Sequence, residues 1–103
     1  MKYKIVITEN AQNDIESVIS LLYTQSGQMA VKKHMESFNK AYLNLSLFPE
    51  MFPMYRYKIP GTDNVRHFSF GKYICFYTVN KASCEVVLLR VLYGKSNIIE
   101  SFK

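Results

Sequence analysis

Two amphipathic helical patterns separated only by Ser26-Gly27 constrain the fold of this chain more than any other feature. In the first pattern, the apolar residues at helical spacing are Ala11, Ile15, Val18 and Leu22. In the second, which runs from about Gln28 to Leu47, they are Val31, Met35, Phe38, Tyr42 and Leu45. Because the connection is so short, the two helices must be antiparallel neighbours. We interpret both stripes as core packing.

Segments with the character of β-strands flank this helical hairpin. One occupies residues 3–8 and ends at Thr8, a residue suited to cap the first helix. After Phe48-Pro49 ends the second helix, an edge-type segment is expected at 55–59, followed by strands at 65–70, 73–79 and 85–93. The sequence therefore predicts one α+β domain over residues 1–103, with the hairpin packed on one face of a small, mainly antiparallel sheet.

The last expected strand is apolar on both sides. Under strict alternation, one face would carry Val86, Leu88 and Leu92, and the other Val87, Leu89 and Val91. The helical hairpin can cover only one face, which predicts an exposed apolar patch that a partner covers. Curling of the strands, which would bury both faces inside the monomer, is the alternative.

The net charge of +5 lies entirely in the second half of the chain. Residues 1–50 carry five basic and five acidic groups, whereas residues 51–103 carry eight basic and three acidic groups and ten of the fifteen Phe and Tyr residues. A basic, aromatic-rich half can attract nucleic acid or an acidic protein. A solvated strand face would have the same composition.

The cysteines and the apolar segments bear on the compartment. Cys75 and Cys84 lack the spacing of a metal site or a redox motif, so we expect reduced thiols in a cytoplasmic protein. Residues 1–4 lead directly into a strand-like segment rather than a signal peptide. No apolar run approaches the ~18 residues that a membrane span needs, so no membrane association is expected.

Motifs of phosphate-binding loops, serine hydrolases and zinc proteases are missing from the sequence, and its eight carboxylates are scattered. No metal or cofactor is therefore expected. His34 is expected on the surface of the second helix, and alternation places His67 and the adjoining Arg66 on opposite strand faces. Arg90 lies in an otherwise apolar strand, so it must reach a solvated edge, a ligand or a carboxylate such as Glu85 or one from another chain.

A basic and phenolic set remains as the candidate for chemistry. Its members are Arg56, Lys58, Arg66, Tyr73, Tyr77, Arg90, Tyr93 and Lys95. Side chains of these types can cleave RNA without a metal, because lysine, histidine or tyrosine transfers protons and arginine stabilises the charge of the phosphorane.

Short segments along almost the whole chain match a known pattern. They are residues 3–8, Ala11 with Asp14-Ile15, Leu43 with Leu47-Phe48-Pro49, Val65-Arg66, residues 73–79 and residues 87–95. In this order and spacing they resemble the RelE/ParE superfamily of small bacterial toxins. The resemblance implies the toxin of a type II toxin-antitoxin pair, neutralised by a cognate antitoxin protein and in contact with DNA only through it.

The branch of the superfamily decides the expected target. RelE-type members cleave mRNA on the ribosome and usually carry an arginine where this chain has Ile74, and often a second where it has Ser96. The apolar Ile74 is similar to ParE-type toxins, which act on DNA gyrase, although ParE-like sequences tend to have histidine at the position of Tyr93. The resemblance therefore implies a gyrase inhibitor without catalysis of its own.

Two alternatives stay open beside this reading. One is a metal-independent, ribosome-dependent endoribonuclease, and the other is an inactive family member. The nuclease would use Arg66, Arg90, Tyr93 and Lys95, with Tyr77 in support. The residues expected to bind the target or the antitoxin are Arg56, Lys58, Arg66, Val86, Leu88, Arg90 and Leu92.

Overall fold

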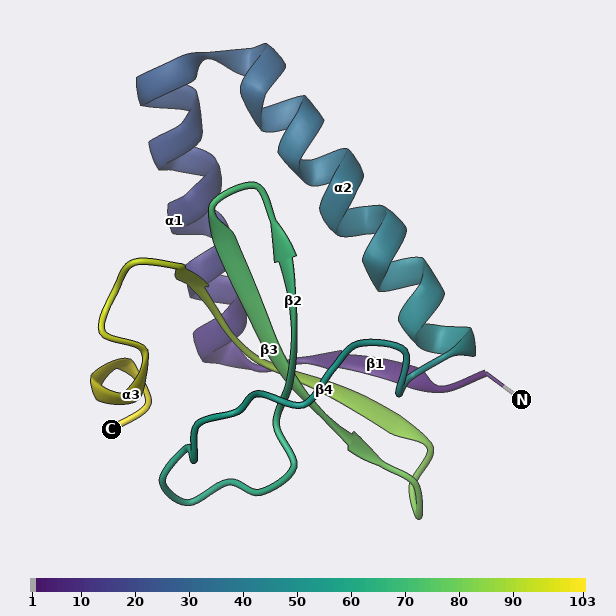
Figure 1. Ribbon diagram of the computed structural model, residues 1–103. Coiled ribbons are helices and arrows are strands. Elements are labelled where there is room, and N and C mark those ends of the chain that lie inside the picture. Colours follow the sequence, from purple (N-terminus) through teal and green to yellow (C-terminus); the bar gives the residue numbers. More distant parts are fainter. Residues whose placement is uncertain (1) are drawn as a thin grey trace.

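The computed structural model describes residues 2–103, which form a four-stranded sheet with a helical hairpin on one face (Figure 1). The elements are β1 (Lys4–Ile7), α1 (Glu9–Ser26), α2 (Gln28–Leu47), β2 (Arg66–Phe70), β3 (Tyr73–Asn80), β4 (Glu85–Tyr93) and α3 (Ile98–Ser101). The strand order is β1-β4-β3-β2. β1 runs parallel to β4, and the other pairs are antiparallel. The predicted α+β architecture is confirmed.

The ends of the two long helices follow from local chemistry. Thr8 caps α1, because its hydroxyl oxygen accepts a hydrogen bond from the Ala11 amide at 3.1 Å. Gly27 separates α1 from α2 with φ +82° and ψ −178°, a backbone conformation open almost only to glycine. The predicted boundaries of the hairpin are confirmed, and its short connection holds the two helices as neighbours.

The main core lies between the helical hairpin and the sheet. The predicted stripes face inward, and Ala11, Phe38 and Leu45 are buried. They pack against aromatic and aliphatic side chains of the strands, including Phe68 and Leu88. Burial of these apolar surfaces is the dominant favourable contribution to folding.

A β-bulge in β4 changes which side chains face the helices. Phe76 pairs with Arg90, but the next residue, Tyr77, pairs with Leu88, which leaves Leu89 as the extra residue. One extra residue reverses the alternation of a strand. Val86, Leu88 and Val91 therefore all join the core under the helices, and the predicted faces of this strand are wrong beyond the bulge.

The second face of the sheet is covered by the chain itself. Its small core consists of Ile59, Val65, Phe76, Leu92 and Ile98. The cover comes from the loop after α2, which crosses the sheet, and from the C-terminal turn α3 (Figure 1). Val86 and Leu88 are 0 % exposed and Leu92 is 9 % exposed, so the prediction that β4 presents an open apolar patch to a partner is wrong. Both faces are buried inside the monomer, by the loop and α3 rather than by curling alone.

The segment at 55–59 is a loop instead of the expected edge strand. It is held at its ends, where the Tyr55 amide donates to the Val65 carbonyl at 2.7 Å and Ile59 forms a bridge with Thr62. Pro53 cannot donate to a ladder, although its carbonyl accepts from the His67 amide at 3.1 Å. Among the helices within residues 2–103, none is both long enough and apolar enough to cross a membrane.

Candidate functional site

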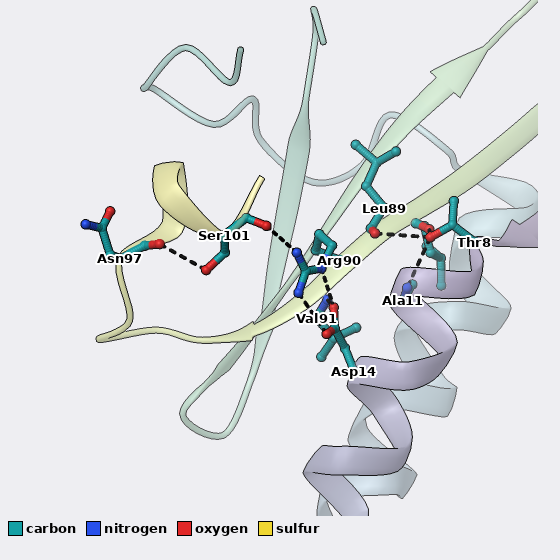
Figure 2. Close-up of polar contacts among 9 residues, drawn as sticks. Thr8, Ala11, Asp14, Leu89, Arg90, Val91, Asn97 and Ser101 are labelled. Carbon is teal, nitrogen blue, oxygen red and sulfur yellow. Dashed lines mark hydrogen bonds and ion pairs between the residues drawn. The ribbon is translucent and has the colours of Figure 1, made fainter. Parts of the chain in front are cut away.

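Arg90 connects three elements of the fold through one guanidinium group (Figure 2). Its Nε donates to Asp14 Oδ2 at 2.7 Å, and its Nη2 donates to Asp14 Oδ1 at 3.0 Å. Its Nη1 donates to the carbonyl of Ser101 in α3, and Asp14 Oδ2 also accepts from the Val91 amide at 3.0 Å. The hydrogen bonds with Asp14 raise the pKa of Arg90. This side chain joins β4 to α1 and α3, and each of its three nitrogens has a partner inside the protein.

The expected carboxylate partner of Arg90 is therefore corrected. Glu85 instead accepts a hydrogen bond from the Ser83 hydroxyl at 2.9 Å. Asp14 lies 76 positions away from Arg90 in the sequence. It is next to Ile15 of the buried face of α1. Only the packing of α1 along β4 brings the two side chains together.

Arg66 is held in a similar way at the start of β2. It donates to the Phe52 carbonyl at 2.8 Å and to Glu50 Oε2 at 3.2 Å, so it fastens the loop after α2 to the sheet. Lys81 Nζ lies 3.0 Å from Glu50 Oε1. The hydrogen bond from Lys81, reinforced by the charges of Lys81 and Arg66, lowers the pKa of the Glu50 carboxyl. His67 points the other way, against Tyr55 and Phe76, as the alternation predicts.

Tyr77 is a core residue with a polar end. It is fully buried, and its hydroxyl donates to the Pro49 carbonyl at 3.0 Å. Burial raises the pKa of Tyr77 to about 12. The phenol therefore holds the segment just after α2 against the sheet and cannot reach a substrate.

Tyr93 and Lys95 remain open at the end of β4. The Tyr93 ring lies edge-on to Tyr73, with 6.0 Å between the ring centroids. His34 of α2 also lies near the end of β4. The centroid of its ring is 6.3 Å from that of Tyr73, and its Nδ1 is 2.8 Å from the Ala30 carbonyl oxygen. The expectation of a solvated His34 is thus wrong, because the β2–β3 turn packs on it and leaves it half-buried.

The five candidate nuclease residues do not form one site. Tyr93 pairs with Tyr73, whereas Arg66 pairs with Tyr77, four positions farther along β3. That spacing is about 13 Å in a strand. Ile74, which stands where RelE-type sequences usually have arginine, packs beside the small core on the second face. Across residues 2–103, no three His, Cys, Asp or Glu side chains are grouped so that they could hold a metal ion.

An exposed basic and aromatic loop contains the candidate binding residues that stay accessible, Arg56 and Lys58. The Arg56 guanidinium lies over the Tyr57 ring, 4.9 Å from its centroid, and donates to the Tyr57 hydroxyl at 2.7 Å. Arginine and tyrosine are the residue types that contribute most at protein interfaces. The other predicted binding residues, Arg66, Val86, Leu88, Arg90 and Leu92, have internal contacts.

A second exposed surface was missed by the sequence reasoning. We call it the α2-end patch: Leu43, Leu47, Phe48 and Met51, which are 66 %, 50 %, 61 % and 47 % exposed. The signal was present, because Leu43 and Leu47 are four residues apart and lie off the buried stripe of α2. Large apolar side chains on the outer side of a helix indicate a contact surface.

Three solved structures with similar folds come from toxin-antitoxin systems. A chain of the chromosomal ParDE system from P. aeruginosa matches with a TM-score of 0.69 and 15 % identity, covering 89 % of this chain and 96 % of that one. A free mutant of E. coli RelE has a TM-score of 0.65 and 15 % identity (99 % and 94 % covered). The archaeal RelE–RelB complex from Pyrococcus horikoshii has a TM-score of 0.63 and 16 % identity (92 % and 98 % covered). At these identities the likeness establishes the fold.

Sequence comparison decides between the branches. No curated protein sequence matches the chain. Residues 5–98 match the family described as the ParE toxin of the type II toxin-antitoxin system parDE. The match spans nearly the whole chain and agrees with the apolar Ile74 in the central strand. The chain therefore belongs to the ParE toxin family of type II toxin-antitoxin systems.

Proposed function

We propose that this ParE-family toxin inhibits DNA gyrase by binding and that a cognate antitoxin protein neutralises it. One observation supports a binding inhibitor: Arg66, Tyr77 and Arg90 form hydrogen bonds within the protein that hold its elements together. A nuclease would need such groups free to stabilise charge on the phosphate, and losing them removes several kcal/mol of transition-state stabilisation (about 3 kcal/mol for each donor). The gyrase target itself rests on the resemblance to ParE-type toxins, and acting on gyrase would place the protein in the cytoplasm.

The exposed loop around Arg56 and Lys58 is the proposed contact with the target. Its two cations and the Tyr57 ring lie in the open, where a partner can desolvate them. Arg56 is already stacked on Tyr57, so little side-chain freedom has to be lost when it binds. The antitoxin would carry any contact with DNA.

The test is a gyrase supercoiling assay with purified protein, run beside a ribosome-dependent mRNA cleavage assay. We expect inhibited supercoiling and intact mRNA. The double variant Arg56→Ala/Lys58→Ala should inhibit at least about tenfold less strongly, as expected for interface residues of these types. The matched control Lys32→Ala/Lys33→Ala removes the same charge from the exposed side of α2 and should inhibit like the wild type.

The conservative variant Tyr93→Phe separates the two mechanisms further. It removes only the phenolic hydroxyl of this exposed side chain at the end of β4. A binding inhibitor should retain its potency, whereas a nuclease that uses this phenol would lose activity. Codon-positioned mRNA cuts with normal supercoiling would overturn the proposal.

A further inference from the structure

We infer that the α2-end patch is the docking surface for an apolar and acidic segment of the antitoxin. This inference rests on the proposed function, because it assumes that a protein antitoxin exists. The patch consists of Leu43, Leu47, Phe48 and Met51, as defined above.

The backbone around the patch is held in place. The Phe48 amide donates to the Asn44 carbonyl at 2.8 Å, and the Met51 amide donates to the Phe48 carbonyl at 3.1 Å. The last turn of α2 is also tied to the residue that precedes β1, the strand beside it (Figure 1), because the Tyr3 amide donates to the Ser46 carbonyl at 2.7 Å. Four apolar side chains are thus presented on a preorganised support, which lowers the entropy lost on binding.

The apolar character of the patch favours a permanent partner over a transient one. Permanent interfaces are more apolar than transient ones, which resemble ordinary protein surface. The exposed loop that we assign to the target has the opposite character, with Arg56 and Lys58 beside Tyr57. An antitoxin that stays bound until it is degraded is the partner that fits the α2-end patch.

Charge on the same side of α2 specifies the chemistry of the partner segment. Continuing from Leu47 and Leu43 toward the start of the helix, the exposed positions at helical spacing are Lys40, Glu36 and Lys33. Lys32 lies beside them, so this side of α2 carries three lysines and one glutamate. A complementary segment has apolar residues opposite the patch and carboxylates opposite the lysines.

The experiment measures binding of the purified product of the adjacent antitoxin gene to variants of the full-length toxin. Leu47→Glu places a charge in the patch and should weaken binding by at least about 100-fold, as expected at the centre of an interface. Leu21→Glu is the matched control: Leu21 is 47 % exposed on α1, outside the patch, and this variant should bind within about threefold of the wild type. Urea unfolding of both variants verifies that they fold.

A charge-reversal variant tests the second part of the inference. Lys33→Glu/Lys40→Glu should weaken binding about tenfold at low salt and reduce the dependence of binding on ionic strength. Equal binding by this variant and the wild type would overturn the assignment of an acidic segment.

Gyrase inhibition is measured on the same variants, so that the two proposals are judged separately. Leu47→Glu should still inhibit gyrase and should escape neutralisation by the antitoxin. Unchanged antitoxin binding by Leu47→Glu would overturn the inference, whether the patch then contacts gyrase or a second copy of this chain. A wild-type toxin that binds antitoxin but leaves supercoiling intact would overturn the gyrase proposal alone.

Discussion

At the scale of single residues, Arg90 shows what an arginine in an apolar strand requires. Its side chain is 21 % exposed and that of Asp14 is 15 % exposed, so each charge depends on the other for most of its compensation. We predict that Arg90→Met or Asp14→Asn alone lowers the free energy of unfolding by about 3 kcal/mol, because the remaining group is left unpaired. Urea unfolding of the single variants and the double variant measures the loss and the coupling.

The pair between Lys103 and Glu100 provides the control. Both side chains are more than half exposed, and ion pairs of this kind contribute little. Lys103→Ala should therefore change stability by less than about 0.5 kcal/mol. A similarly small effect of Asp14→Asn would contradict the structural role of Arg90.

Tyr77 predicts a dependence of stability on alkaline pH. Its pKa is about 12 in the folded protein, against 10.0 for an ordinary tyrosine, so folding favours the protonated phenol. This contribution is fully present below pH 10 and is lost as the pH rises toward 12. The wild type should lose stability more steeply than Tyr77→Phe between pH 10 and 12, as measured by denaturation midpoints. Parallel curves would contradict the burial of this hydroxyl.

At the scale of elements, the β2–β3 turn and α2 depend on each other through Gly71 and His34. Gly71 has φ +62°, and a Cβ at this position would overlap the His34 ring. Gly61 has φ +77° with open space around it, so Gly61→Ala reports backbone strain alone. We predict that Gly71→Ala costs about 1 kcal/mol more than Gly61→Ala, because the ring must give up its contact with Ala30.

Removing the His34 ring tests whether its contact with the Gly71 turn causes this difference in stability. In the His34→Ala background, the two glycine substitutions should cost nearly the same in thermal or chemical unfolding. If Gly71→Ala still costs about 1 kcal/mol more than Gly61→Ala in that background, then backbone strain in the turn, and not the contact with α2, explains why position 71 is glycine.

The C-terminal turn α3 is a second element whose role can be measured. Ile98 is buried against the small core on the second face, which also holds Phe76 and Leu92. We predict that Ile98→Ala lowers stability by about 2–4 kcal/mol and increases the fluorescence of a dye that binds apolar surface. Ile99→Ala, at a half-buried neighbour, should have a smaller effect on both measurements. Equal effects of Ile98→Ala and Ile99→Ala would show that Ile98 of α3 is not packed against the small core.

At the scale of the whole molecule, internal pairing decides which positive charges act on partners. The cations within ion-pair distance of carboxylates are Arg66, Lys81, Arg90 and Lys103. The basic loop with Arg56 and Lys58 is exposed and has no carboxylate within that distance among residues 2–103. These two cations are therefore free to act on a partner, as are the exposed Lys32, Lys33 and Lys40 of α2.

This distribution predicts how association responds to salt. The association rate with an acidic partner should fall several-fold between about 50 and 200 mM salt, because exposed charges are screened. The dissociation rate from the antitoxin should change less, since the α2-end patch is apolar. Stopped-flow or surface-based kinetics at several salt concentrations measure both rates. Dissociation that depends on salt as strongly as association would contradict an apolar antitoxin contact.

Much of the architecture could be predicted from local sequence. Helical spacing, Thr8, Gly27 and the turns between strands set the elements and nearly all of their boundaries, since these signals act between residues that are close in the chain. The apolar residue Ile74 likewise pointed to the ParE branch, which the family match confirms.

The candidate site depended on contacts that local sequence does not encode. The extra residue Leu89 reverses the faces of β4, Asp14 reaches Arg90 across 76 positions, and the loop and α3 cover a face expected to be open. These long-range contacts form because a buried charge without a partner and an uncovered apolar face both raise the free energy of the folded protein. The sequence by itself determined the elements, their order and the family. Only the tertiary structure decided which charges are used internally and which surfaces stay open to partners.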